Sequence, residues 1–121
     1  MIPDEFEIIR QRLILHSDSQ EVDLIVTTGG TGLAPRDVTP EATAAVIEKT
    51  VPGMAELMRL EGIKQNPRAA LSRAVVGVRN RTLIINLPGS VKGVRESLSA
   101  LSSVLGHALE VISGNTVRCG G

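Results

Sequence analysis

The stretch "TTGGTG" (27–32) follows the apolar run "DLIV" (23–26) and holds three glycines within four positions. Glycine exposes bare backbone, so a ligand can approach the main chain closely at such a stretch, and threonine hydroxyls add hydrogen-bond donors. The spacing matches neither a Walker loop nor a dinucleotide fingerprint. An anion-binding loop and a plain tight turn therefore both remain open. The candidate binding residues are Thr28, Gly29, Gly30, Thr31 and Gly32.

A second turn of small residues, "PGS" (88–90), follows another apolar run, "TLIINL" (82–87). In open α/β sheets, ligands bind beyond the carboxyl ends of the strands, and a helix N-terminus there offers unpaired N–H groups to an anion. Pro-Gly is a turn signal anywhere, so this motif is weak by itself. Two such turns facing one crevice would suit a ligand with separated anionic groups. The candidates here are Pro88, Gly89 and Ser90.

An acid, Asp37, lies in "LAPRDVTPEA" (33–42), five residues after the glycine stretch. Mg²⁺ is commonly held by one or two carboxylates together with substrate phosphates. Asp37 is therefore a candidate metal ligand beside an anion site. An exposed loop acid, or an additional cap for the helix that starts near Pro40, is the alternative.

Composition excludes several classes of function. The formal net charge is zero and Phe6 is the one aromatic residue, which argues against nucleic-acid binding. Cys119 is the one cysteine, so the chain can form no internal disulfide. No apolar run is long enough to span a membrane, and the acidic start does not resemble a signal peptide. We therefore expect a cytoplasmic protein with no membrane partner.

Periodicity and capping signals predict alternating helices and strands. Asp4 and Glu7 have capping-box spacing at the start of the first helix, and Thr39 precedes Pro40 as a cap for the second. The pattern indicates an α/β fold, a three-layer α/β/α sandwich with a mostly parallel sheet plus a hairpin. We expect one domain over 1–121, with 110–121 as a loosely ordered tail. The expected helices are 4–16, 39–49, 52–62 and 91–107, and the expected strands are 23–28, 73–78 and 81–87, with 63–72 irregular.

Several motifs together resemble one known family. The chain is similar to the molybdopterin adenylyltransferases of molybdenum cofactor biosynthesis, of the Mog and MoaB type, which include the G domain of gephyrin. The similarity extends over residues 2–109. The motifs that carry it are T-T-G-G-T-G (27–32), R-D-V-T-P-E-A (36–42), P-G-M (52–54), L-S-R (71–73) and N-L-P-G-S (86–90).

The resemblance implies a reaction and a set of roles. These enzymes use ATP and Mg²⁺ to attach AMP to the terminal phosphate of molybdopterin, releasing pyrophosphate. It implies that Asp37 and Asp4 are catalytic and metal-binding carboxylates, that Thr28 to Gly32 hold the pterin, and that Ser90 lies near its phosphate. Ser72 and Arg73 match L-S-R and are implied to line the pocket. A homotrimer or higher oligomer, and the molybdenum-insertion enzyme as a partner, follow in the same way.

The chain departs from the family pattern at its start. Family members usually carry a further strand-helix-strand before the motif that contains Asp4, so we expect a domain that is incomplete at the N-terminus. A fragment of a longer protein, sheet edges covered by another subunit, and a degenerate relative are all open explanations. The alternative function is a noncatalytic molybdopterin-binding or scaffold protein that lost the nucleotide half of the site.

Overall fold

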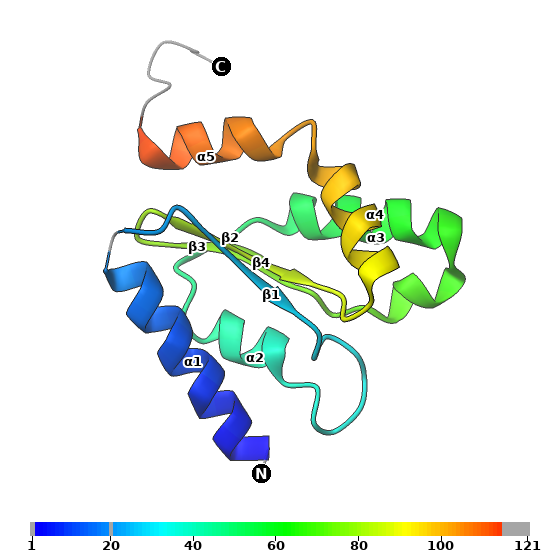
Figure 1. Cartoon of the computed structure of the whole chain (residues 1–121), viewed down its shortest axis with the longest axis horizontal. Helices are drawn as coiled ribbons and strands as arrows, with labels where there is room; N and C mark the ends of the chain where they lie inside the picture. The colour runs from blue at the N-terminus through cyan, green and yellow to red at the C-terminus, as the bar shows by residue number, and fades with distance from the viewer. Residues whose placement is uncertain (1, 20, 115–121) are drawn as a thin grey trace.

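The computed structural model describes residues 2–19 and 21–114, and for residues 2–4 only the backbone. Cys119 and the expected tail from residue 115 onward lie outside the described part of the chain. Figure 1 shows the arrangement of the elements. In order they are α1 (Ile2–Asp18), β1 (Leu24–Thr28), α2 (Thr39–Ala44), β2 (Lys49–Thr50), α3 (Pro52–Gln65), the 3₁₀ helix η1 (Pro67–Leu71), β3 (Val76–Arg79), β4 (Thr82–Leu87), α4 (Val91–Leu101) and α5 (Leu105–Ser113).

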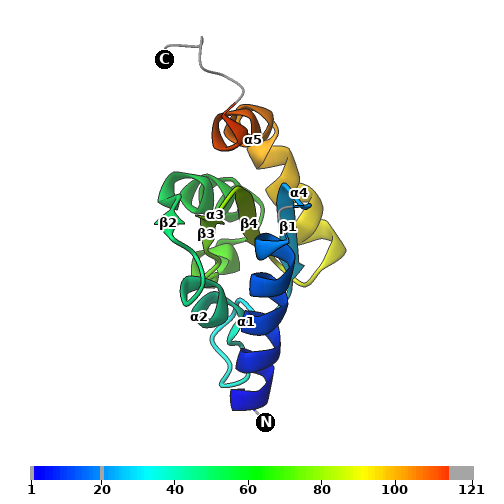
Figure 2. The same cartoon turned by 90° about the vertical axis from the view of Figure 1, so that its left-hand side faces the viewer.

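The four strands form one mixed sheet in the order β1-β4-β3-β2. β1 is parallel to β4, whereas β4 to β3 and β3 to β2 are antiparallel pairs. Figure 2 shows β1 and β2 at opposite edges. The expectation of a mostly parallel sheet was wrong, because two of the three strand pairings are antiparallel and only β1 with β4 is parallel.

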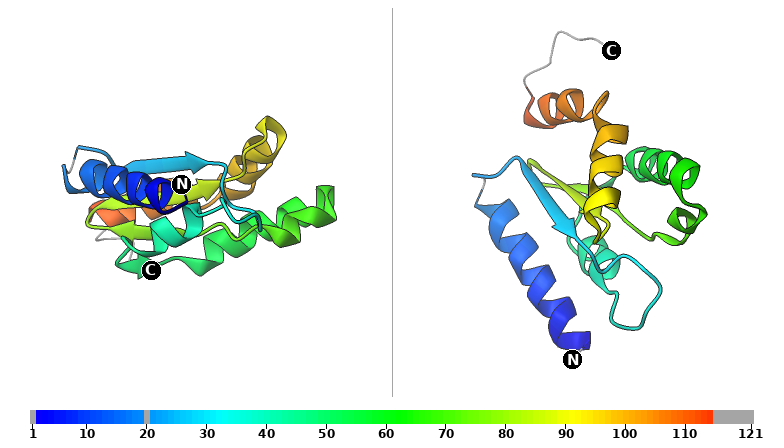
Figure 3. Two further views of the ribbon diagram at one scale, coloured as in Figure 1. Left: turned by 90° about the horizontal axis from the view of Figure 1, so that it is seen from below. Right: turned by 45° about the vertical axis from the view of Figure 1, so that its right-hand side comes forward.

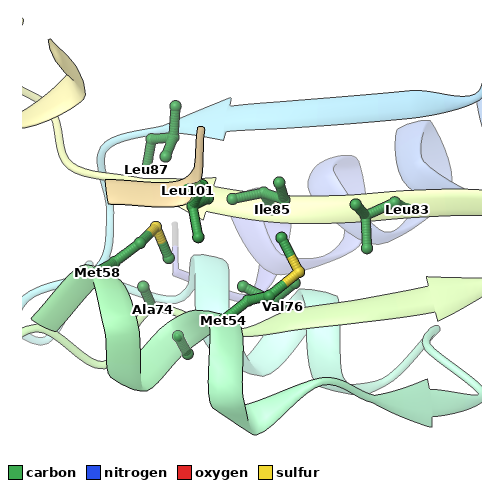
Figure 4. Close-up of a cluster of buried hydrophobic side chains, with 9 residues drawn as sticks. Met54, Met58, Ala74, Val76, Leu83, Ile85, Leu87 and Leu101 are labelled. Atoms are coloured by element: carbon green, nitrogen blue, oxygen red, sulfur yellow. The ribbon is translucent and has the colours of Figure 1, made fainter. Parts of the chain in front are cut away.

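Helices cover both faces of the sheet, so the α/β class and the layering are as expected. One core lies between Ile84 of β4 and the helices below it in Figure 1, where Leu13 of α1 and Val46 are buried. The other lies between alternate residues of the same strand and the helices α3, α4 and α5. Because successive side chains of a strand point to opposite faces, β4 supplies both cores. Figure 4 shows members of the second core: Met54, Met58, Ala74, Val76, Leu83, Ile85, Leu87 and Leu101.

The predicted hairpin is confirmed, but its first strand starts three residues later than expected and its turn lies one residue later than the predicted Arg79 and Asn80. Arg79 pairs with Thr82, which leaves a two-residue turn of Asn80 and Arg81. Asn80 adopts a left-handed φ of 54°, a conformation that asparagine tolerates better than most residues. Its backbone N–H donates to Glu48 Oε1 at 2.8 Å.

The first helix is longer than predicted and starts earlier. Leu13 is buried with Ile9 packed beside it, so these two residues form the side of the helix that faces the sheet. The helix begins at Ile2, so the backbone of Asp4 lies inside its first turn rather than at the N-cap position expected for it. Glu7 instead pairs with Arg10, one turn further along the helix.

The second helix ends at Ala44 instead of Lys49, and its N-cap is Val38 with no side-chain cap, so Thr39 does not cap it. The segment after it turns to pair with β3, where the N–H of Glu48 donates to Val78 O at 2.8 Å and that of Val51 to Val76 O at 2.8 Å. These pairings satisfy the outer edge of the hairpin, so tertiary contacts overrode helix propensity there.

The last predicted helix is two helices. α4 ends at Leu101, and Ser102 folds its hydroxyl back onto Ser99 O at 2.8 Å, a local bond that competes with helix continuation. α5 then packs on the same core as α4. Its last turn includes residues 110–113, so the expected tail was wrong over those residues, because α5 has apolar side chains to bury. α3 likewise runs past Gly62 to Gln65, and the segment expected to be irregular contains η1.

No helix within the described residues has both the length and the apolar content needed to cross a membrane.

Candidate functional site

The two turns singled out in the sequence lie side by side. Thr28 pairs with Leu87 at the ends of the parallel strands β1 and β4, and the Gly29 N–H donates to Leu87 O at 2.9 Å. A Cβ on Gly89 would lie 3.4 Å from Gly29 Cα. The right-hand view of Figure 3 shows the segments that follow β1 and β4 leaving the same end of the sheet. The crevice expected beyond the strand ends is therefore bordered by both turns.

The chain itself requires glycine at two positions of the first turn. Gly29 and Gly30 have φ of 86° and 71°, a region that residues with a Cβ rarely adopt. A Cβ on Gly30 would overlap Thr39 Oγ1, and Gly30 O accepts the Thr39 N–H at 3.2 Å. The glycines thus allow the loop to fold back onto the start of α2, and the fold requires them whether or not a ligand binds.

Asp37 lies immediately behind the wall of the crevice. Its Oδ2 accepts the Ala34 N–H at 2.9 Å, and a Cβ on Gly32 would lie 2.9 Å from that oxygen. One carboxylate oxygen therefore closes the turn 34–37. No cluster of three or more His, Cys, Asp or Glu suited to a metal occurs among residues 2–19 and 21–114.

Arg73 contacts the loop rather than the crevice. Its Nε donates to Gly32 O at 2.8 Å and its Nη2 to Asp37 O at 2.6 Å, while Nη1 pairs with Glu41. Its backbone N–H donates to Thr31 O at 2.9 Å. The hydrogen bond from Arg73 lowers the pKa of the Glu41 carboxyl below its usual range, so this pair is charged at neutral pH.

A cavity of about 340 Å³ opens next to the two turns, between α3, η1 and the start of α4. Apolar side chains of α3 and η1 share its lining with polar groups. The residues around it are Thr31, Gly32, Ala55, Met58, Arg59, Gly62, Asn66, Arg68, Ala69, Leu71, Ser72, Ala74, Asn86, Pro88, Ser90, Lys92, Gly93, Glu96 and Ser97.

The structure brings part of the predicted set into this cavity. Thr31, Gly32, Ser72, Pro88 and Ser90 line it. Asp4 lies at the start of α1, and nothing is described of its side chain. The other candidates do not line it, and they are Thr28, Gly29, Gly30, Asp37, Arg73 and Gly89.

Three basic residues lining the cavity were missed. Arg59 also donates from Nη2 to Ala74 O at 3.2 Å, and Lys92 Nζ lies 4.0 Å from Glu96. With Arg68 they make three cations against the single carboxylate of Glu96 in the lining. The sequence offered one signal for Arg59 as a residue of the lining, because on the expected helix it follows Met58 and lies one turn after Ala55. Only the tertiary fold brings it to Arg68 and Lys92.

Asn86 was quoted in a motif but not singled out, and it is fully buried. Its Nδ2 donates to Thr27 Oγ1 and Thr43 Oγ1, both at 3.0 Å, and its Oδ1 accepts the Val75 N–H at 3.0 Å. Each polar group of the amide thus has a partner, as buried polar groups require. Asn86 therefore joins β1, α2 and the segment that leads to β3 directly beneath the cavity.

Ser90 is the N-cap of α4, since its Oγ accepts the Gly93 N–H at 3.0 Å. The positive end of the helix dipole, spread over the first unpaired N–H groups, faces the cavity that Ser90 and Lys92 line. Together with the three cations, this gives the cavity a positive electrostatic potential that favours anionic ligands.

Comparison with known proteins identifies the family. Residues 1–107 match the family model described as "Probable molybdopterin binding domain". The chain belongs to this family. Molybdopterin adenylyltransferase from Helicobacter pylori is 48% identical over 118 residues, which cover 98% of this chain and 67% of that protein. Gephyrin from Dictyostelium discoideum is 42% identical over 113 residues, covering 93% of this chain and 16% of gephyrin.

A solved structure agrees with the fold. The molybdopterin biosynthesis enzyme MoaB from Thermus thermophilus is 59% identical, with a TM-score of 0.85 over 92% of this chain and 70% of that one. The resemblance predicted from the glycine, R-D-V-T-P-E-A and N-L-P-G-S motifs is confirmed.

Proposed function

We propose that this chain is a molybdopterin adenylyltransferase acting in molybdenum cofactor biosynthesis. The observation that carries the proposal is the positive cavity beside two adjoining strand-end turns, in a chain 48% identical to an enzyme of that name. Molybdopterin and ATP, the substrates that this activity requires, are both phosphorylated. A cavity lined by three cations and the start of a helix suits at least one of them.

The chemistry needs positioning more than covalent help from the protein. An oxygen of the terminal phosphate of molybdopterin attacks the α-phosphorus of ATP, the bond to the β-phosphate oxygen breaks, and pyrophosphate leaves with the electron pair. The protein must hold two anions in line and offset their charge. Arg59, Arg68 and Lys92 supply charge, while Thr31 and Ser72 supply hydroxyl donors at the cavity wall.

Magnesium remains part of the proposal, with Asp37 as its protein ligand and Asp4 as the second candidate. Mg²⁺ keeps several waters and often takes only one or two carboxylates besides substrate phosphates, so the lack of a larger acidic cluster in the described residues does not exclude it. Asp37 uses Oδ2 to close its turn, which leaves Oδ1 for a cation. Bound Mg²⁺ would neutralise phosphate charge.

A homotrimer or higher oligomer and the molybdenum-insertion enzyme as a partner are proposed from the resemblance, and a cytoplasmic location from the sequence of the chain itself. Apolar side chains are exposed at Ile8 and Leu15 of α1 and at Val26 of the edge strand β1, which supports association between copies. Light scattering on the purified protein measures the oligomeric state directly.

The activity is tested with purified protein, molybdopterin, ATP and Mg²⁺, by following pyrophosphate release and the adenylylated pterin. We expect Asp37→Asn to lower kcat about 100-fold, because a carboxylate that offsets transition-state charge is lost, while its side-chain oxygen can still accept the Ala34 N–H. Asp23→Asn is the matched control, since Asp23 is exposed at the opposite end of β1. Full activity in Asp37→Asn rejects the assigned role, and pterin binding without turnover by the unmodified chain favours the binding or scaffold function.

A further inference from the structure

One side chain, that of Arg73, donates hydrogen bonds to both ends of the segment that follows the glycine turn. Arg73 donates through Nε to Gly32 O at 2.8 Å and through Nη2 to Asp37 O at 2.6 Å. These carbonyls mark the two ends of the segment 32–37. A guanidinium holds its N–H groups in a fixed planar fork, so two simultaneous bonds fix the distance between the ends.

The third group of the fork is anchored outside the loop. Nη1 pairs with the Glu41 carboxylate in the first turn of α2. The same turn is attached to the loop by the bond from the Thr39 N–H to Gly30 O at 3.2 Å. Glu41 therefore sets where the Arg73 guanidinium lies relative to α2, and through it where the loop lies.

The backbone of Arg73 connects two chain segments that line the cavity. Its N–H donates to Thr31 O at 2.9 Å, and the neighbouring residue, Ser72, lines the cavity together with Thr31 and Gly32. The Arg73 side chain is not itself in the lining. Its contacts thus act on the shape of the site and not on a ligand directly.

We propose that Arg73, held by Glu41, is a positioning residue that sets the shape of the glycine loop and the placement of Ser72 beside Thr31 in the lining of the cavity. This inference rests on the proposed function for its effect on catalysis, but the brace itself is independent of any ligand. In place of the expected substrate-binding role, Arg73 is assigned the role of holding the loop in position without contacting the substrate.

Hydrogen exchange of the backbone amides, measured by mass spectrometry on the unliganded protein, tests the brace. We expect exchange in peptides covering 30–38 to accelerate about tenfold in Arg73→Lys, since one ammonium cannot replace a planar fork that bonds three separate oxygens. Glu41→Gln gives a smaller increase in the same peptides, because the carboxylate charge is lost but Arg73 keeps its two loop carbonyls. Arg12→Lys, at an exposed position on α1, is the matched control and leaves exchange unchanged.

Kinetics test the consequence for the reaction. We expect Arg73→Lys to raise the KM for molybdopterin about tenfold with kcat changed much less, because a displaced loop loses contacts with the ligand. A general loss of stability would instead lower the active fraction and leave KM unchanged. Should Arg73→Lys fail to fold, Glu41→Gln decides, with the same direction and smaller changes.

Unchanged exchange over 30–38 in both variants overturns the brace. Faster exchange with unchanged KM overturns its role in positioning the site. Wild-type protein that turns over no molybdopterin, while Arg73→Lys still loosens residues 30–38, refutes the proposed function and leaves the brace standing.

Discussion

The two strand-end turns border the same crevice but are held in different ways. The glycine turn after β1 depends on Arg73, far along the chain, together with Thr39 and Glu41 nearer by. The turn after β4 is held by its own neighbour, since Ser90 caps α4 by accepting the Gly93 N–H at 3.0 Å. One turn is thus built by tertiary contacts and the other by local capping.

This difference separates two kinds of sequence signal. A cap is legible in a few adjacent residues, because donor and acceptor are close in sequence. A brace such as Arg73 to Gly32 joins positions 41 residues apart, and no local pattern announces it. Substitutions in the first turn should therefore affect remote parts of the site, whereas those in the second should stay local.

The largest effect on stability is expected from Gly30→Ala. The new Cβ would overlap Thr39 Oγ1, and residue 30 would have to keep a φ of 71°, which alanine rarely adopts. We therefore expect the free energy of unfolding in urea to fall by about 2 kcal/mol. Gly53→Ala is the control, because a Cβ there has open space within a helix and should be neutral or stabilise by up to about 1 kcal/mol. Equal effects from the two variants would contradict the idea that the first turn is built on contact with α2.

A smaller and more local loss is expected from Ser90→Ala. Removing the hydroxyl leaves the Gly93 N–H without its cap and should cost about 1 kcal/mol in urea unfolding. Hydrogen exchange should accelerate at the start of α4 and stay unchanged in 28–38. Ser99→Ala, exposed within the same helix, should show no loss. Faster exchange spreading into the glycine turn would mean that the two turns are coupled more tightly than their contacts indicate.

The smallest effect concerns the charge on Glu41. Its pKa is lowered by the hydrogen bond from Arg73 from an ordinary value of 4.5, so its stabilising contribution is complete above about pH 4.5 and is lost as pH falls through the lowered pKa. Because the Arg73–Glu41 pair is partly exposed, we expect the free energy of unfolding of the wild type to exceed that of Glu41→Gln by less than about 1 kcal/mol at pH 7. The difference should shrink toward pH 3 in unfolding experiments. A difference that is constant from pH 7 to pH 3 would show that the ion pair contributes nothing.

Elements with strong local signals were predicted well. The apolar run before the glycines became β1, Pro52 began α3, and the expected hairpin formed with its turn one residue later than predicted, at Asn80 and Arg81. Errors gathered where partners are remote. Residues 48 and 49, expected in the helix 39–49, pair with β3 together with residues 50 and 51, and the strand directions follow from pairings that periodicity does not encode.

The candidate site was partly predictable for the same reason. Thr31, Gly32, Ser72, Pro88 and Ser90 came from motifs and do line the cavity. Arg59, Arg68 and Lys92 come from three separate elements, so their common environment exists only in the folded chain.

The sequence by itself determined the family, the α/β class and the presence of two glycine-containing turns at strand ends, because each is written in adjacent residues as motif, period or turn chemistry. The tertiary structure alone decided that those turns touch, that three cations share one cavity, and that Arg73 faces the loop. Hydrogen bonds and electrostatic interactions act over a few ångströms in space, whatever the separation along the chain.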